Sequence, residues 1–430
     1  MGRQPFLVAR VITCSFACTL LVAPSLGAAE PLTLAHVLDA VRARNPSIAG
    51  AQARADAAAA VPARVRAYDD PVVSWEAWNF PESFHVDEAD NNILRLSQRI
   101  PFPGKRTLAG EMAAREADGM RHDAGAVALD AVTLAKRAYA DLWRAHRTRA
   151  VAERDLGLIE RTARLVEQRY ATMPATAQVD VIRAQVEVSH ATGELRTAEL
   201  AIEEARATLR AVMSAPGTEL GVPVDPPRPA LPASVADLIE RAFHERPELA
   251  AKDAAIARET TGVRLAQKGY LPDFEVSVGR FLNHDNPNGF GAMASMTVPL
   301  AWKSKYDAGV AEANARTMAA EADRRKAIDD VRRDVEQAYV RAKTALVLHD
   351  LFAGTHVPHA EQALRVTEAA YVTGGSDLTA LLETARNAER VHLEHVGAAA
   401  DFERAYADLE RAVGTDLPRA ATTKRGGHDD

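Results

Sequence analysis

The chain has 430 residues, with 52 lysines and arginines against 59 aspartates and glutamates, and a formal net charge of −7. An acidic chain is a poor candidate for binding nucleic acid, because affinity for a phosphate backbone comes mainly from lysine and arginine. The only two cysteines, Cys14 and Cys18, lie in an N-terminal apolar segment. If that segment is removed, the remaining chain has no thiol, which excludes disulfides, thiolate metal sites and cysteine nucleophiles.

The N-terminus has the order of a secretory signal peptide. Arg3 and Arg10 lead into an apolar run from Val11 to Ala23, and small residues follow at 27–29. We therefore predict a signal peptide over residues 1–29, removed from the exported protein. Beyond residue 30 no apolar stretch approaches the roughly 18 residues that a membrane-spanning helix needs. Any passage through a membrane would have to use strands.

The pattern of the remaining sequence predicts the same order of elements twice, with a proline-rich connector between them over residues 215–233. For the first repeat, 30–214, we predict a helix over 32–66 with Thr33 as its N-cap, strands over 72–80 and 92–100, a helix over 105–170, a turn at 173–176 and a helix to Val212. For the second, 234–414, we predict a helix over 234–268, strands near 273–282 and 290–300, a helix from Lys303, a turn at 373–376 and a helix to Val413. Residues 415–430 read as a flexible tail.

Matching segments support the duplication. Residues 44–48 recur at 245–249, residues 100–102 at 298–300, residues 138–139 at 338–339 and Tyr170 at Tyr371, always about 200 residues apart. A repeated sequence indicates that one structural unit occurs twice, and it decides how the whole fold is interpreted.

The long helices carry a strict heptad pattern. In the first repeat the apolar residues step by three and four without a break at Val181, Ala184, Val188, Ala191, Leu195, Ala198, Ile202, Ala205, Leu209 and Val212. This spacing predicts helices that pack lengthwise as a coiled coil. A helix of about 65 residues would be roughly 100 Å long, which no compact globule requires.

The strands alternate instead. Phe274, Val276 and Val278 share one face, while Asp273 and Glu275 lie on the other. Each strand has the length of a tilted membrane-crossing strand, with Trp75 and Trp78 as candidates for the interfacial girdle. The alternative is a soluble antiparallel sheet with one wet face. Four strands are too few for a closed barrel, and open edges are not tolerated in lipid. Membrane passage would therefore require several copies of the chain, with two giving eight strands and three giving twelve.

The ordered motifs resemble the TolC family of outer-membrane efflux proteins. The resemblance rests on the opening helix 38–48 with Asn45-Pro46, the segment 97–106 after the second strand, Tyr371 with Gly374, and the duplication. It implies a mainly α fold with a membrane β-barrel: a homotrimer with a 12-stranded barrel in outer-membrane lipid and a 12-helix tunnel in the periplasm. It also implies docking to a periplasmic adaptor and an inner-membrane pump of the resistance-nodulation-division type. The segment 100–106 looks most like the heavy-metal branch, the CzcC-like and CusC-like proteins.

The resemblance further implies that the two helical turns form the periplasmic gate and contact the adaptor. The residues concerned are Asp180, Arg183, Gly374, Gly375, Ser376, Asp377 and Glu383. Ser376 and Ala380 replace the family's arginine and first acid, whereas Glu383 keeps the second, and a ring of three Glu383 would select cations. The alternative for Asp180 and Arg183 is an ordinary solvated helix start.

Histidines suggest one local site. Folding the second hairpin about its turn places His356 and His359 opposite His392 and His395. Imidazoles suit zinc, copper or nickel, so the four predict a metal or pH-sensing cluster. The alternative is a set of partly buried, hydrogen-bonded histidines in a wide seam, and Pro358 is expected to disturb the register.

No motif supports an enzyme or a cofactor. The dinucleotide-like glycines at 289–294 lie inside an alternating strand and open no helix. We therefore expect the outer-membrane channel of a tripartite efflux system, a passive exit duct for heavy-metal cations. Alternatives are the same channel exporting drugs or other small molecules, or a soluble periplasmic coiled-coil adaptor.

Overall fold

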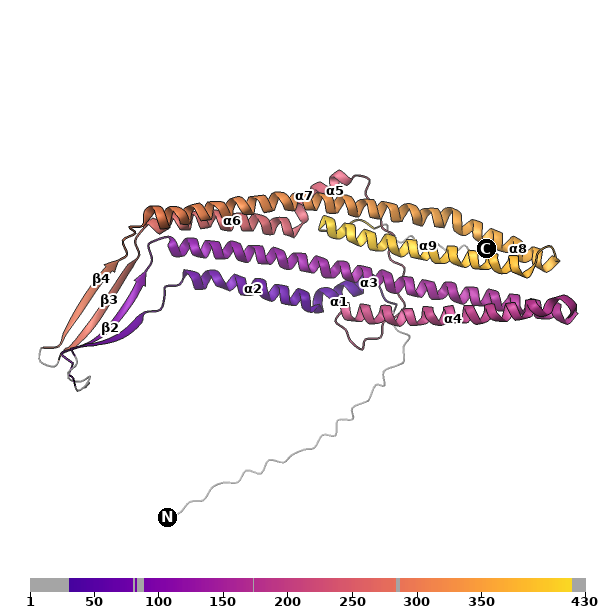
Figure 1. Cartoon of the computed structure of the whole chain (residues 1–430), viewed down its shortest axis with the longest axis horizontal. Helices are drawn as coiled ribbons and strands as arrows, with labels where there is room; N and C mark the ends of the chain where they lie inside the picture. Colours follow the sequence, from indigo (N-terminus) through magenta and orange to yellow (C-terminus); the bar gives the residue numbers. More distant parts are fainter. Residues whose placement is uncertain (1–30, 80–81, 83–88, 173, 284–286, 420–430) are drawn as a thin grey trace, which may run out of the picture.

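The structure, a computed structural model, describes residues 31–79, 82, 89–172, 174–283 and 287–419. The predicted signal peptide and residues 420–430 of the predicted tail lie outside these ranges. The molecule is long and narrow, with the strands at one end and the turns of two helical hairpins at the other (Figure 1).

The first half contains the helices α1 (Leu34–Arg44), α2 (Pro46–Arg66), α3 (Lys105–Thr172) and α4 (Pro174–Val212), with strands β1 (Val72–Trp78) and β2 (Asn91–Ile100). The second half contains α5 (Val235–Glu245), α6 (Pro247–Gln267), α7 (Asp307–Leu351), α8 (Val357–Thr373) and α9 (Leu378–Val413), with strands β3 (Phe274–Asn283) and β4 (Gly289–Met296). Short helical segments are η2 (Lys268–Tyr270) and the π-helical turns η3 (Trp302–Tyr306) and η4 (Phe352–His356). In the described ranges, no helix combines the length and the apolar composition required to cross a bilayer.

Each predicted opening helix is two helices in the structure. Thr33 caps α1 as expected, but the helix ends at Arg44 and a new one begins at Pro46. Asn45 causes the break: its side chain accepts from the N–H of Ser47 at 2.9 Å, while its Nδ2 donates to the carbonyl of Val212 at 3.1 Å. Proline is favoured at the first position of a helix, because the N–H that it lacks would have no intrahelical partner at that position.

The second repeat makes the same break at Arg246. Its Nη1 donates to the carbonyl of Ala412 at 3.2 Å, in the place where Asn45 contacts Val212. Pro247 then begins α6. Different side chains therefore tie the start of the second helix to the end of the hairpin in both repeats.

The four strands form one antiparallel sheet in the order β1-β2-β3-β4. β2 pairs with β3 from Asn91 opposite Asn283 to Ile100 opposite Phe274, so strand pairing joins the two halves of the chain. Lys105 Nζ contacts Asp273 Oδ1 at 2.8 Å where the sheet meets the helices. The sheet lies beyond the helix ends in Figure 1.

The register gives the sheet one apolar face, as the alternation predicts. Its exposed large side chains are Val73, Trp75, Leu94, Leu96, Phe274, Val276, Val278, Phe290 and Met296. The opposite face carries the Arg95–Glu76 ion pair at 3.1 Å. Trp78 lies on this polar face and contacts Glu76, so only Trp75 fits the predicted girdle position.

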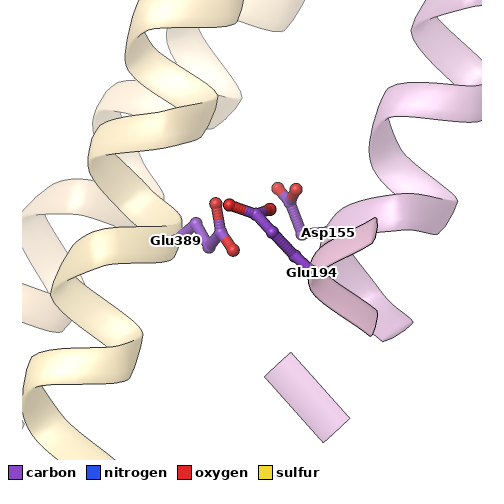
Figure 2. A group of neighbouring side chains, drawn as sticks. All are labelled: Asp155, Glu194 and Glu389. Atoms are coloured by element: carbon purple, nitrogen blue, oxygen red, sulfur yellow. The ribbon is translucent and has the colours of Figure 1, made fainter. Parts of the chain in front are cut away.

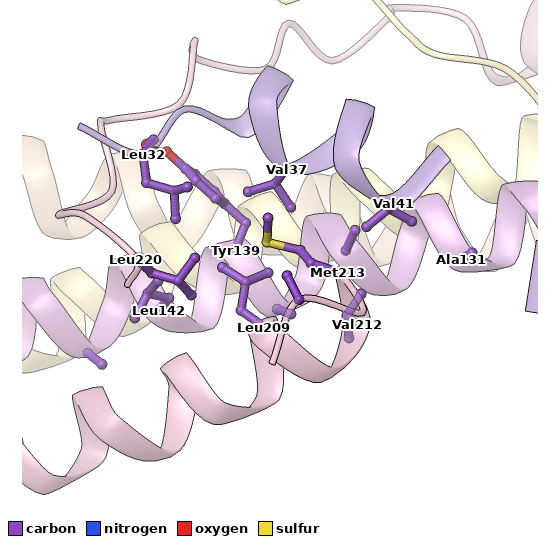
Figure 3. Packing of buried hydrophobic residues seen from close by; sticks show 14 of the residues in the cluster. Leu32, Val37, Val41, Ala131, Tyr139, Leu142, Leu209, Val212, Met213 and Leu220 are labelled. Atoms are coloured by element: carbon purple, nitrogen blue, oxygen red, sulfur yellow. Dashed lines mark hydrogen bonds between the residues drawn. The ribbon is translucent and has the colours of Figure 1, made fainter. Parts of the chain in front are cut away.

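The heptad seam is confirmed. Ala184, Ala191, Ala198, Ile202 and Leu209 of α4 are all buried. The α1 helix and the end of α4 pack on α3 around Tyr139, Leu142 and Leu209 (Figure 3). An equivalent core forms in the second repeat between α5, α7 and α9, with Val335, Tyr406 and Leu409 at its centre.

Three tyrosines, of which Tyr139 and Tyr406 are buried and Tyr339 is half-buried, hold the connector against the middle of the helices. Tyr139 donates to the carbonyls of Leu32 and Val224, at 2.9 and 2.6 Å. Tyr339, its counterpart in the repeat, donates to Pro232 at 3.1 Å, and Tyr406 donates to Ala230 at 3.3 Å. Burial, followed by the nearby Asp225 charge, raises the pKa of Tyr139 to about 12, so its hydroxyl stays a donor.

The predicted flexible tail is wrong for its first five residues. Leu417 is buried, Asp416 contacts Lys136, and Arg419 contacts Glu403 at 2.8 Å. These contacts add a second carboxylate to Lys136, which also pairs with Glu410, and give the largely buried Glu403 a cationic partner.

Candidate functional site

The interface between α3 and α9 carries opposite charges near the middle of the molecule. Lys136 Nζ lies 2.8 Å from Glu410 Oε2, and both side chains are at most 6 % exposed. Three further pairs cross the same interface, Asp130 with Arg411, Arg137 with Asp408 and Asp141 with Arg404. We call these four pairs the central ladder. A buried ion pair of this kind fixes the register between helices, because neither charge has water as an alternative partner.

Closer to the turns, α4 faces α9 across a groove of about 400 Å³. Val179, Ile182 and Val186 are exposed along it. Glu187 and Arg386 form an ion pair across its floor, and Arg183 Nη1 donates to Thr379 Oγ1 at 3.2 Å. The groove is therefore apolar on the α4 side and closed by two polar contacts between the hairpins.

The structure places the predicted gate residues in two groups. Arg183 and Glu383 both line the groove. Asp180 lies one helical turn before Arg183 on α4 and does not line it. The other predicted residues build the second turn, described next.

The turn between α8 and α9 is shaped by its own backbone chemistry. Gly374 has a φ of +82°, a left-handed conformation that glycine adopts without strain. Gly375 N donates to the carbonyl of Ala370 at 2.8 Å, and Ser376 follows it, partly buried. Asp377 accepts from the N–H of Ala380 at 2.8 Å and so caps α9. Asp377 therefore has a structural role at the start of α9. The first turn contains Met173, which is outside the described residues.

Three carboxylates meet between the central ladder and the groove. Asp155 of α3, Glu194 of α4 and Glu389 of α9 each present an oxygen within 4.8 Å of the others, and Figure 2 shows their side chains converging from both hairpins. We call them the acid cluster. In the described part of the chain it is the only group of three or more histidines, cysteines or carboxylates close enough to share a metal ion.

Two members of the acid cluster, Asp155 and Glu389, hold protons more tightly than isolated carboxylates do. Burial, with the charges of Glu194 and Glu187, raises the pKa of Asp155 to about 6. Burial, with the charges of Asp155 and Glu194, raises the pKa of Glu389 to about 7. Part of the cluster is therefore protonated near neutral pH, because like charges at short range oppose one another's ionisation.

The four predicted histidines do not gather at one height. His395 stacks on His349, with ring centroids 5.2 Å apart, and His392 Nε2 lies 3.4 Å from Glu361 Oε1. His356 packs against Phe352 and His359 is exposed. The predicted four-histidine cluster is thus corrected to separate contacts. The cause is η4, whose wider π-helical turn shifts the register of the outgoing arm just where His356 ends it.

Sequence reasoning missed the acid cluster and His349. The heptad pattern fixes which residues face the partner arm within a hairpin, but the cluster forms between hairpins. Glu194 and Glu389 each lie directly beside a seam residue, Leu195 and Ala388, and nothing in the pattern of either helix brings them together.

Residues 238–415 match the family described as "Outer membrane efflux protein". No curated protein sequence matches the chain significantly. The fold is shared with solved channels at low identity: CusC, at a TM-score of 0.75 and 12 % identity over 90 % of this chain and 93 % of that one; the open state of the MtrE outer membrane channel of Neisseria gonorrhoeae, at 0.74 and 18 % over 91 % of each chain; and the outer-membrane channel OprN, at 0.72 and 18 % over 89 % and 90 %.

These likenesses are nearly equal for differently named channels, so they do not single out a heavy-metal branch. What they share with this chain is the order of long helical hairpins and a four-stranded antiparallel sheet. The family match lies within the second repeat, and the likeness to the solved channels shows that this chain has their fold.

Proposed function

We propose that three copies of this chain form one passive exit duct, which works with a periplasmic adaptor and an inner-membrane pump of the resistance-nodulation-division type. The observation that carries the proposal is the sheet. Its apolar face is exposed over all four strands, and β1 and β4 pair with no further strand in the described ranges.

A sheet with these properties needs both lipid and neighbours. An apolar face suits the hydrocarbon of a bilayer, where unpaired backbone groups at an edge are each unfavourable by several kcal/mol. Pairing β4 of one copy with β1 of the next removes both edges. Three copies of four strands give a twelve-stranded barrel, which is within the range of bacterial membrane barrels, whereas one copy is below the smallest.

We propose that the groove between α4 and α9 belongs to the gate and to the surface that the adaptor contacts. Two polar contacts, Glu187 with Arg386 and Arg183 with Thr379, join the hairpins at this groove. Both lie between the acid cluster and the turns. An adaptor that separated the hairpins here would have to break these two contacts and open the buried apolar cluster that includes Leu158 and Leu381, but it would not have to break the central ladder.

For the cargo we propose metal cations. The support is electrostatic: the chain is acidic, and Glu383, Glu187 and the acid cluster concentrate carboxylates between the ladder and the turns. A negative lining raises the local concentration of cations and slows anions. Export of drugs or other small molecules through the same duct is the competing proposal, and sensitivity of a deletion strain to metals and to drugs decides between the two.

Two neighbouring substitutions in β3 test the lipid-facing sheet. Val276 lies on the apolar face and Glu275 on the polar face. Arginine facing lipid is unfavourable by about 2–4 kcal/mol near the bilayer centre and is tolerated on the lumen side. We expect Val276→Arg to abolish the detergent-extracted trimer in the outer-membrane fraction and Glu275→Arg to retain it. Equal assembly of both variants, or a monomeric wild-type chain, contradicts the proposal.

A further inference from the structure

We propose that His349 and His395 form a binding site for a transition-metal cation of the zinc, nickel or copper type inside the second hairpin. His349 lies in the last turn of α7, and His395 lies on the facing arm α9. Their rings are stacked with 5.2 Å between centroids and 12° between planes. The site differs from the acid cluster in position and in ligand chemistry, and it does not depend on the cargo of the channel.

Each ring has a shielded nitrogen without a partner. His349 Nδ1 and His395 Nε2 are both buried and form no hydrogen bond within the described residues. Burying a polar atom without a hydrogen-bond partner destabilises the fold by about 1–3 kcal/mol. A neutral imidazole nitrogen in this state is a preferred ligand of zinc, copper and nickel, and binding a cation would satisfy both atoms at once.

The separation of the rings fits a shared ion. Zinc lies about 2.0–2.1 Å from an imidazole nitrogen, which puts two rings around a tetrahedral ion at roughly 5 Å between centroids. The observed 5.2 Å agrees with this value. Because the planes are nearly parallel, one ring has to turn about χ2 on binding, and water would complete the coordination.

Local structure supports a functional interpretation over a packing one. The π-helical turn η4 begins directly after α7 and displaces the outgoing arm beside His349. π-helical turns are uncommon and are frequent at functional sites. At the corresponding positions the first repeat has Arg149, which pairs with Glu153, and Glu194 of the acid cluster. The hairpin therefore folds in the first repeat without this pair of histidines.

The charged neighbours are few. Arg228 and Asp350, which contact each other at 2.6 Å, face His349 from the connector and from α7. His392 faces His395 from the same helix and contacts Glu361 of α8. Among the described residues no carboxylate contacts either of these two nitrogens, and Glu361 contacts His392, one helical turn before His395 on α9.

Calorimetric titration of the purified full-length protein with zinc chloride and nickel chloride tests the site. We expect one ion per chain for the wild type. Replacing one ligand, in His349→Gln or His395→Gln, should weaken binding at least about tenfold, since even the loss of an outer-shell partner has an effect of that size. The double variant should bind no ion at this site.

The matched control is His356→Gln/His359→Gln, which removes two exposed histidines of the same arm. It should retain the wild-type stoichiometry and affinity. Circular dichroism and the oligomeric state of each variant establish that it is folded. Absence of binding by the folded wild type overturns the proposal, as does unchanged binding by the folded double variant. Loss of binding in the control alone assigns the ion to the exposed histidines and also overturns it.

Discussion

The two ends of the contact between α9 and the first hairpin follow opposite electrostatic rules. In the central ladder every acid faces a base, and Lys136 and Glu410 are almost completely buried. Towards the turns, Glu389 of the same helix faces Asp155 and Glu194. One helix thus joins a stretch with matched charges to a stretch in which like charges oppose contact. The difference shows a middle held by matched charges beside a stretch of unfavourable charge, whereas nearer the turns the hairpins are held by the buried apolar cluster that includes Leu158 and Leu381.

The largest expected effect is at the fixed middle. Lys136→Ala leaves the buried Glu410 with a more distant cation, Arg419 Nη2 at 3.6 Å, so we expect a destabilisation towards the lower end of the about 3–5 kcal/mol typical for loss of one member of a buried pair. Denaturant unfolding of the purified protein measures it. Arg137→Ala is the control, because Arg137 is 47 % exposed and its pair with Asp408 should contribute less than about 1 kcal/mol. An equal loss of unfolding free energy in Lys136→Ala and Arg137→Ala would show that the buried and the exposed ion pairs contribute alike.

The next effect concerns the acid cluster and depends on pH. The ordinary pKa of Glu389 is 4.5 and its pKa in the fold is about 7. Between these values the folded protein holds a proton that the unfolded chain has released, so stability falls as pH rises through this window. Glu389→Gln removes that dependence.

We expect Glu389→Gln to stabilise the protein at pH 8 by about 1 kcal/mol, a figure reduced for partial exposure, and to have little effect at pH 4. Asp155→Asn should act in the same direction. Because the two acids raise each other's pKa, the double variant should gain less than the sum of the single ones. Thermal unfolding at the two pH values measures this. A destabilised Glu389→Gln at pH 8 would show that the cluster is held by hydrogen bonds and not opposed by charge.

The smallest effect is at the exposed contact nearest the turns. Arg386→Ala breaks the pair with Glu187, but Arg386 is 59 % exposed, and such pairs contribute about 0–1 kcal/mol. Unfolding should therefore change little, whereas conductance of the reconstituted channel should rise if this contact restrains the hairpins. Arg390→Ala, one turn further along α9, provides the control, since Arg390 contacts only Asn387 of its own helix among the interactions described. Unchanged conductance in Arg386→Ala would place the restraint elsewhere.

Periodicity predicted the elements well because it records local burial. The alternation of Val276 and Val278 identified the apolar face, and the heptad containing Ala184 and Leu209 identified the seam. Contacts between the hairpins are a different matter: neither Lys136 with Glu410 nor the acid cluster follows from the pattern of one helix. Two local irregularities account for the wrong predictions. The break at Asn45 divides the predicted opening helix into two, and the π-helical turn η4 shifts the register on which the predicted histidine cluster depended.

The unbroken course of α3 has a mechanical consequence. Its 68 residues give it a length of roughly 100 Å, and Lys136 and Tyr139 fasten it near its midpoint to α9 and to the connector. Between that midpoint and the strands α3 also packs against α2 and α6, and near the turns it joins the buried apolar cluster that includes Leu158 and Leu381. A helix supported along its whole length sets a constant spacing between the first hairpin turn and the end of β2.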